Sequence, residues 1–394
     1  MPPDQRTLHV ARPVRSRLVY LIGQLSSGGA ERQLFYLLQA LPRERYRPAV
    51  VVWNYRQEDR YVQLIAELRV PVHPLSARSE PLAKLHALRR CIRELNPEVI
   101  HSYSFFTNVA AHLGAMGTGA VAIGSIRGDY LQDLRSTGRI RGAANARWPR
   151  FQIYNSICAL KNARTRRVAR PRAATVVRNG LDLERFHPRP CPRGATVPTI
   201  LGVGSLLAPK RWDRLLLAAA ALKRRQLKFQ IEIVGDGPMR TPLEQLARRL
   251  GVADVVRFVG HLDRIEAKLQ TSSCLAHPSE SEGCPNVVME AMACGRAVVA
   301  TDSGDAPLLV ENGHTGFVVG RLDDMALVEP LGILLGNYEL CCQMGRAGRL
   351  KAEREFGLGR LAAQTLEAYR AAGWNDRSAS AGADSQSLAG QFRH

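Results

Sequence analysis

The chain alternates short aliphatic runs with amphipathic stretches along most of its length. In the first half, the runs expected to form strands cover residues 17–23, 48–53, 70–75, 98–101, 120–125 and 151–155. A second series covers residues 198–204, 229–235, 255–259, 273–276, 296–301 and 315–319. Helical periodicity fills stretches between them, such as residues 82–95 and 212–223. Because strands that alternate with helices form a parallel sheet covered by helices, the sequence predicts an α/β protein.

Two such series indicate two doubly wound domains, which a chain of 394 residues can accommodate. Asn179-Gly180 is a strong turn signal near the end of the first series, and residues 190–194 read as a linker. We therefore place the boundary near residue 190. This predicts a first domain at residues 17–190, a second at residues 191–373, and a disordered lead and tail at residues 1–16 and 374–394.

Residues 279–295 read Ser-Glu-Ser-Glu-Gly-Cys-Pro-Asn-Val-Val-Met-Glu-Ala-Met-Ala-Cys-Gly. They predict a loop followed by a helix, with Pro285 in its first turn and Gly295 just past its last. The first N–H groups, which make an anion site, belong to Asn286, Val287 and Val288. Glu282 and Glu290 flank that site, and carboxylates accept hydrogen bonds from hydroxyls. An anionic ligand with hydroxyls on both sides fits this pattern.

The same residues resemble the donor-site signature of retaining glycosyltransferase family 4, the group 1-type glycosyl transferases of the GT-B fold. The shared positions are Glu282, Gly283, Pro285, Glu290, Ala291, Met292, Ala293 and Gly295. The resemblance implies two facing Rossmann-like domains, with the nucleotide-sugar donor in the second domain and the acceptor in the first. It implies that the last helical stretch, residues 349–372, crosses back onto the first domain. It also implies that Glu282 and Gly283 position the donor sugar and that Glu290 binds the ribose.

Glycines follow several predicted strands and let the backbone approach a ligand closely. Gly28 and Gly29 follow the first strand but lack the spacing of a dinucleotide fingerprint. They resemble the first cleft loop of the family, the alternative being a plain tight turn. Gly204 and Gly235 end two strands of the second half in the same manner and resemble further donor-side loops.

Lys210 and Arg211 lie beyond the first strand of the second half. A departing diphosphate needs its charge neutralised, which two cations at this place supply. Ser205 stands where the family often has a basic residue. We find no DxD metal motif, and Asp302 and Asp305 read as a loop residue and a helix cap. We therefore expect a reaction without metal or other cofactor.

The resemblance further implies front-side attack with retained anomeric configuration and, in many members, a histidine near the reacting carbon. At the equivalent strand end this chain has no histidine, and we predict that Arg127 or Asp129 takes that place. His101 ends another strand and is either a packed or a catalytic histidine. Cys284, inside the donor loop, is expected to be exposed but not nucleophilic.

The net charge of +20 indicates an acidic partner: a membrane surface, a nucleic acid or a charged substrate. Arginines concentrate in residues 127–178, near Trp148 and Phe151, which fits docking on an anionic membrane; a solvated charged face is the alternative. No apolar stretch is long enough to span a bilayer, and the N-terminus lacks a secretion signal. We expect a cytoplasmic protein, peripheral on the inner face of the plasma membrane.

The predicted function is transfer of a hexosyl group from a nucleotide sugar to a glycan or lipid-linked acceptor, with a UDP-sugar favoured as the donor and a GDP-sugar as the alternative. The setting would be cell-surface polysaccharide or glycolipid synthesis. One alternative is a nucleic-acid-binding protein, although no zinc finger, RNA-recognition or helix-turn-helix pattern supports it. Another is a GT-B phosphorylase or a sugar epimerase.

Overall fold

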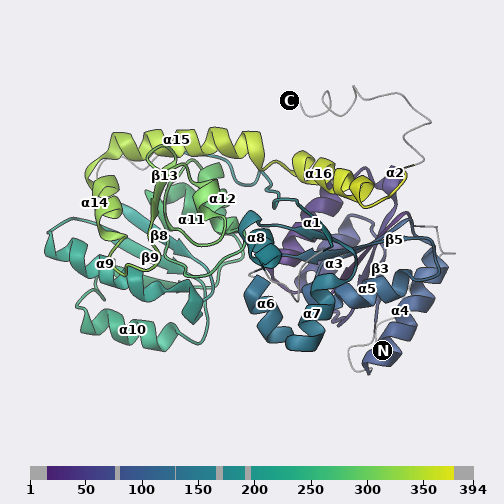
Figure 1. Cartoon of the computed structure of the whole chain (residues 1–394). Coiled ribbons are helices and arrows are strands. Elements are labelled where there is room, and N and C mark those ends of the chain that lie inside the picture. The colour runs from purple at the N-terminus through teal and green to yellow at the C-terminus, as the bar shows by residue number, and fades with distance from the viewer. Residues whose placement is uncertain (1–15, 76–79, 129, 166–171, 191–196, 377–394) are drawn as a thin grey trace, which may run out of the picture.

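The computed structural model of the chain describes residues 16–75, 80–128, 130–165, 172–190 and 197–376. It contains two parallel sheets, each with helices on its faces (Figure 1). The predicted fold class, two doubly wound α/β domains, is confirmed. The lead at residues 1–15 and the tail from residue 377 lie outside the described residues.

The first sheet has the strand order β3-β2-β1-β4-β5-β6-β7. Its strands are β1 Leu18–Ile22, β2 Pro48–Val52, β3 Val72–Pro74, β4 Val99–Ser102, β5 Val121–Ile126, β6 Phe151–Tyr154 and β7 Ala173–Val176. Every residue of β1 and β2 is buried, as expected for strands covered on both faces. The helices are α1 Gly29–Ala40, α2 Arg43–Tyr46, α3 Arg60–Glu67, α4 Pro81–Leu95, α5 Asn108–Ala115, α6 Tyr130–Thr137, α7 Arg139–Arg147 and α8 Ile157–Thr165. A short 3-10 helix, η1, covers Phe105–Thr107.

The second sheet has the order β10-β9-β8-β11-β12-β13. Its strands are β8 Thr199–Val203, β9 Gln230–Val234, β10 Val256–Gly260, β11 Cys274–His277, β12 Ala297–Thr301 and β13 Gly316–Val319. The helices are η2 Ala208–Lys210, α9 Trp212–Arg224, α10 Arg240–Arg249, α11 Glu266–Thr271, α12 Asn286–Ala293, α13 Ala306–Leu309 and α14 Val328–Gly336. The predicted strands match the observed ones to within one or two residues, but the edge strand β7 of the first sheet was not predicted.

The chain crosses between the domains twice, and the two crossings touch. The last helical stretch, predicted as continuous over residues 349–372, is instead two helices, α15 Tyr338–Glu355 and α16 Leu358–Ala371. They break where Phe356 enters the core and its carbonyl accepts a 2.7 Å hydrogen bond from the N–H of Leu181. In Figure 1, α15 lies along the second domain and α16 continues over the first. The crossover helix is therefore confirmed, with a break between its two parts.

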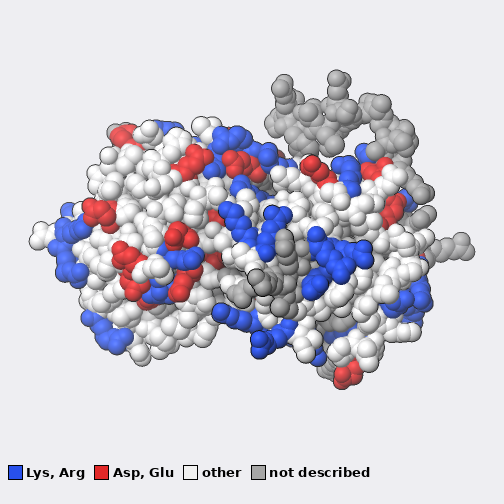
Figure 2. Space-filling view, viewed as in Figure 1, with Lys and Arg blue, Asp and Glu red and all other residues white. Residues whose placement is uncertain are grey.

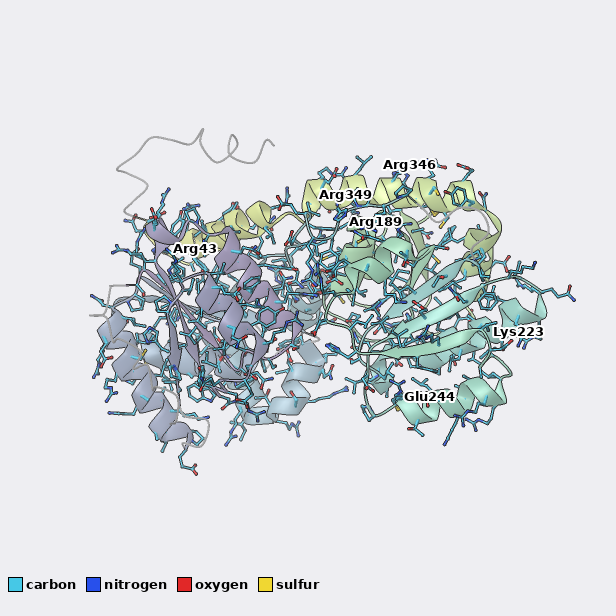
Figure 3. The ribbon with its side chains drawn as sticks, turned by 180° about the vertical axis from the view of Figure 1, so that it is seen from behind. Arg43, Arg189, Lys223, Glu244, Arg346 and Arg349 are labelled. Carbon is cyan, nitrogen blue, oxygen red and sulfur yellow. The ribbon has the colours of Figure 1, made fainter. Side chains whose placement is uncertain are left out.

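Arg349 of α15 also binds the first crossing, the segment at residues 181–190 that leads from the first domain to the second. Its Nη1 donates to the carbonyls of Phe186 and Ala293, at 2.7 and 2.8 Å. Figure 3 labels Arg349 on α15 and Arg189 on the first crossing. One side chain of the second domain therefore binds the connecting segment and α12 together.

The predicted disordered tail begins too early. Trp374 and Asp376 are buried, at 4% and 7% exposure. Trp374 donates through Nε1 to Glu98 Oε2 at 2.8 Å, and Arg17 Nη2 lies 2.8 Å from Asp376 Oδ1. Residues 374–376 therefore belong to the first domain, because these partners pair their polar groups there.

In both sheets the strand order reverses beside the first strand, between β1 and β4 and between β8 and β11. In open parallel sheets the crevice at such a reversal, beyond the carboxyl ends of the strands, is where ligands bind. Among the described residues, no helix is long and apolar enough to cross a membrane.

Candidate functional site

The donor loop runs from β11 to α12 as predicted, with two corrections at the start of the helix. Pro285 is the residue before α12, not in its first turn, because its ψ of 103° is extended. The N–H of Val288 bonds to the Pro285 carbonyl at 3.2 Å, so only those of Asn286 and Val287 lack an acceptor among the described residues. Gly295 lies past the helix with a φ of +68°, as predicted. The anion site at the start of α12 is thus narrower than the sequence indicated.

Two helix N-termini from different domains converge here. Gly28 precedes α1 and Gly29 is its first residue. A Cβ atom on Gly29 would lie 3.2 Å from Asn286 Nδ2, so a larger residue would require the Asn286 side chain to shift. Asn179 Nδ2 donates to Asn286 Oδ1 at 2.7 Å. The partial positive ends of both helices therefore face one place between the domains.

Glu282 and Lys210 form a close ion pair on the second domain. Lys210 Nζ lies 2.5 Å from Glu282 Oε1, and His277 Nε2 lies 3.2 Å from the same oxygen. Burial alone would raise the pKa of Glu282, but His277 and Lys210 outweigh it and lower that pKa to about 2. Glu282 is therefore a carboxylate at neutral pH, able to accept hydrogen bonds from sugar hydroxyls.

A cavity of about 200 Å³ lies between the domains at this ion pair. Its lining comes from both domains: Arg127, Gly128 and Gln132 from the first, and Leu207, Pro209, Lys210, Ser281, Glu282, Gly283 and Cys284 from the second. A Cβ atom on Gly283 would lie 3.1 Å from the Gly128 carbonyl oxygen. The structure thus brings the predicted Lys210, Glu282, Gly283 and Arg127 together in one place.

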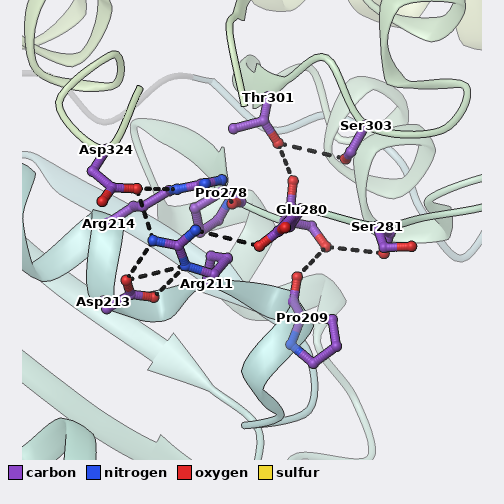
Figure 4. A network of polar contacts seen from close by, with 11 residues as sticks. Pro209, Arg211, Asp213, Arg214, Pro278, Glu280, Ser281, Thr301, Ser303 and Asp324 are labelled. Carbon is purple, nitrogen blue, oxygen red and sulfur yellow. Dashed lines mark hydrogen bonds and ion pairs between the residues drawn. The ribbon is translucent and has the colours of Figure 1, made fainter. Parts of the chain in front are cut away.

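Arg211 is placed differently from Lys210. Its guanidinium bonds to Asp213, to Glu280 and to Asp324 (Figure 4). The hydrogen bonds to Asp213, despite some burial, raise the pKa of Arg211 further above its ordinary value. Its charge is therefore already balanced by carboxylates, and Lys210 is the cation of the second domain that lines the cavity.

Glu290 is 1% exposed and has a partner that the sequence analysis missed. Arg32 of α1 places Nη2 2.5 Å from Glu290 Oε1, across the domain boundary. Arg32 is the last residue of the Gly-Gly-Ala-Glu-Arg string after the first strand, which is the only sequence signal for it. The carboxylate predicted to bind ribose is thus held by the opposite domain.

Gly204 and Gly235 lie side by side at the ends of β8 and β9. Their φ angles are +156° and +141°, and a Cβ atom on Gly235 would overlap the Gly204 carbonyl. Both positions therefore require glycine for the close approach of two backbones.

In the first domain, Arg127 follows β5 and lies in the cleft as predicted. Its Cζ is 3.8 Å from the centre of the Tyr103 ring. All three side-chain nitrogens are buried, with no hydrogen-bond partner in the described parts of the chain. Asp129 lies outside the described residues. His101 is a packed histidine, because its ring nitrogens lie 2.7 Å from Tyr369 Oη and Ser125 Oγ.

Asp305 is the N-cap residue of α13, as expected, but its side chain makes no bond to that helix. Its carboxylate instead accepts from Ser156 Oγ and from the N–H groups of Ile157 and Cys158, each at 2.9 Å. A carboxylate of the second domain therefore caps α8 of the first. Asp302 is a loop residue, as expected, and accepts from the Arg321 N–H at 2.7 Å.

The expected exposure of Cys284 is wrong. Cys284 is buried at 7% exposure, and burial raises the pKa of its thiol to about 12. Trp148 and Phe151 are both half-buried, and Arg172 lies over the Trp148 ring at 5.8 Å. Among the described residues of this region, the large apolar side chain that is exposed is Ile140, at 87%.

Comparisons with known proteins identify relatives of both halves. The chain is 36% identical over 227 residues to D-inositol 3-phosphate glycosyltransferase of Streptomyces scabiei, which covers 52% of this chain and 50% of that protein. It is 31% identical over 208 residues to a GDP-mannose-dependent alpha-(1-6)-phosphatidylinositol monomannoside mannosyltransferase of Mycobacterium tuberculosis, covering 48% and 54%. The chain thus spans about half the length of the curated relatives it matches.

Among solved structures, Anabaena HepE in complex with UDP superposes with a TM-score of 0.77 at 19% identity, covering 90% of this chain and all of that one. The lipopolysaccharide glycosyltransferase WaaG superposes with a TM-score of 0.67 at 15% identity, over 89% and 98%. Both support the GT-B fold. Residues 27–185 match the model of Glycosyltransferase Family 4, and residues 187–351 match that of Glycosyl transferases group 1. Together these matches take in most of the chain, which therefore belongs to the family 4, group 1-type glycosyltransferases.

Proposed function

We propose that this chain is a retaining glycosyltransferase that moves a hexosyl group from a nucleotide sugar to a glycan or lipid-linked acceptor. The observation that carries the proposal is the convergence of the α1 and α12 N-termini beside the Lys210–Glu282 pair. Helix N-termini and a lysine suit a diphosphate, and a buried carboxylate suits sugar hydroxyls. The convergence lies at the strand-order reversals of both sheets, where such ligands bind.

In the proposed reaction, the acceptor hydroxyl oxygen forms the new bond to the anomeric carbon as the bond to the diphosphate breaks. The hydroxyl proton passes to the departing phosphate oxygen on the same face, so the configuration is retained. Lys210 and the N–H groups of Asn286 and Val287 stabilise the charge that develops on the diphosphate. Glu282 holds the sugar, and Glu290, oriented by Arg32, accepts from the ribose. No step requires a metal.

For the donor, we propose a UDP-sugar first and a GDP-sugar second. The UDP-bound HepE structure resembles this chain over 90% of its length, whereas the GDP-mannose-dependent relative matches 48% of it. The names of the curated relatives contain inositol phosphate and phosphatidylinositol, which supports an acceptor in glycolipid or cell-surface glycan synthesis.

The proposal includes docking of the first domain on an anionic membrane from the cytoplasmic side. Ile140 is 87% exposed and lies between the exposed Arg139 and Arg141 at the start of α7. Figure 2 shows Lys and Arg side chains gathered across the middle of one face. Apolar side chains among arginines bind lipid interfaces. Vesicles of phosphatidylglycerol should bind the protein at low salt and release it at high salt, and Ile140→Asp should weaken binding. If the vesicles do not bind the protein, the proposal of membrane docking is contradicted.

The test of the enzyme is release of nucleoside diphosphate from UDP-glucose and GDP-mannose, with a bacterial lipid extract as the acceptor source and EDTA present. We expect release from one donor. Lys210→Met should slow it about 100- to 1000-fold, the usual cost of removing a donor that stabilises developing charge. Lys228→Met, which removes one exposed lysine from the same domain, is the matched control. Release that Lys210→Met leaves unchanged would contradict the assigned role of Lys210.

A further inference from the structure

Arg127 is a buried cation without a counter-charge in the described chain. Its guanidinium carries five N–H donors, and none of its nitrogens has a partner there. The Tyr103 ring lies against it, with Cζ 3.8 Å from the ring centre, and the Tyr103 hydroxyl is also buried with no partner in the described part of the chain. A planar guanidinium stacked on an aromatic ring keeps its edge free for two parallel hydrogen bonds.

The titratable groups whose pKa shifts have Arg127 among their causes are uncharged at neutral pH. They are His101, Tyr20, Tyr103 and Tyr369. Burial lowers the pKa of His101, with Arg127 as a second cause, and burial raises the pKa of each tyrosine. None of these four groups can supply a negative charge. An arginine side chain in a protein stays protonated. A buried unpaired charge is strongly unfavourable, so we expect an anion to bind beside the Arg127 guanidinium.

The donor does not account for that ion. Its diphosphate has Lys210 and the N-terminus of α12 on the second domain. Arg127 follows β5 of the first domain and lines the opposite wall of the cavity. Asn155, at the end of the neighbouring β6, donates to the Arg127 carbonyl at 3.0 Å, and its own Oδ1 is buried with no partner among the described residues. Arg127 is the member of this buried polar group that lines the cavity, on the wall that faces the donor.

We propose that Arg127, stacked on Tyr103, binds an oxyanion of the acceptor, either a phosphate or a carboxylate. The inference rests on the proposed function, because the proposed function places the donor on the wall of the cavity that the second domain forms. It names the acceptor class as an anionic molecule whose phosphate or carboxylate lies close to the hydroxyl that is glycosylated.

The experiment follows thermal unfolding of the full chain at constant ionic strength with inorganic phosphate or glucuronate as probes, each with and without saturating UDP. UDP occupies the donor side, so a remaining response reports the second site. We expect one probe to raise the unfolding temperature of the UDP-bound protein, phosphate indicating a phosphorylated acceptor and glucuronate a carboxylated one. Arg127→Gln should weaken that response about 10- to 100-fold in probe concentration and keep the UDP shift.

Arg139→Gln is the control, since it removes one exposed positive charge from the same domain. Tyr103→Leu keeps the charge but removes the ring, and should weaken the probe response as well. Without ligand, Arg127→Gln should unfold at the same or a higher temperature, because an unpaired buried charge is lost. The proposal would be overturned if the wild type responded to neither probe. It would also be overturned if Arg127→Gln lost the UDP shift and kept the probe response, or if ligand-free Arg127→Gln unfolded at a lower temperature than the ligand-free wild type. If UDP fails to bind at all, the donor site fails separately, and the arms without UDP still test Arg127.

Discussion

Replacing Asp305 with alanine removes a carboxylate that joins the two domains. Asp305 is fully buried on the second domain and accepts three hydrogen bonds from Ser156, Ile157 and Cys158 at the start of α8. Two of these donors are backbone N–H groups of a helix N-terminus, where a carboxylate also interacts favourably with the helix dipole. The alanine side chain can replace neither effect.

The expected cost follows from those three donors. A buried donor left without a partner costs about 1–3 kcal/mol, and the two N–H groups and one hydroxyl would all lose theirs. Entry of water into the vacated space recovers part of this. We expect Asp305→Ala to lower the free energy of unfolding by about 3–5 kcal/mol. Asp305→Asn, which keeps one oxygen, should lose about half as much.

The assay is urea unfolding followed by circular dichroism, with Asp302→Ala as the control. Asp302 is an exposed loop aspartate that accepts a single backbone hydrogen bond, so its loss should cost no more than about 1 kcal/mol. A double-mutant cycle of Asp305→Ala with Ser156→Ala should show a coupling energy above about 0.5 kcal/mol. The reasoning is refuted if Asp305→Ala costs no more than Asp302→Ala.

Three further outcomes follow from the donor loop. The pKa of Glu282 is lowered to about 2, so its contribution to the free energy of unfolding is present above about pH 4.3 and is lost as the pH falls towards 2. The wild type should therefore lose about 3 kcal/mol more unfolding free energy over this pH range than Glu282→Gln. Urea unfolding that gives parallel pH profiles for the two proteins would contradict this. Gly304→Ala, whose Cβ would enter the Gly283 carbonyl, should abolish nucleotide binding in a calorimetric titration, whereas Gly117→Ala, also at a positive φ but with open space around it, should not. Cys284 should resist iodoacetamide in the native protein because it is buried with a pKa of about 12, and mass spectrometry showing rapid native labelling would be inconsistent with that.

Local signals in the sequence were sufficient for the fold. Each buried strand is a short aliphatic run between turn residues, and each helix has its own periodicity, so the elements could be read without knowledge of their partners. The break between α15 and α16 could not, because Phe356 leaves the helix to bond with Leu181 of the other crossing. The tail boundary was missed for the same reason, since Trp374 and Asp376 are ordered by contacts with Glu98 and Arg17.

The site was predictable where a motif is contiguous or follows a strand end. Glu282, Gly283 and Lys210 were located in that manner. The ion pair of Arg32 with Glu290 was not, and neither was the bond from Ser156 to Asp305, which joins residues 149 positions apart. Such contacts depend on how two domains face each other, which no local pattern encodes.

The most direct test of the donor site is thermal unfolding with UDP, GDP or ADP, each with EDTA, on the wild type, Glu290→Gln and Glu353→Gln. Glu353 is a half-exposed helix residue paired with Arg349, and serves as the control. A nucleotide at about a hundred times its dissociation constant adds about 2.7 kcal/mol of stability. We predict that one nucleotide raises the unfolding temperature of the wild type and of Glu353→Gln, and that Glu290→Gln, compared with its own ligand-free state, loses that shift. A wild type that responds to no nucleotide, or a Glu290→Gln variant that responds fully, would contradict the donor site described above.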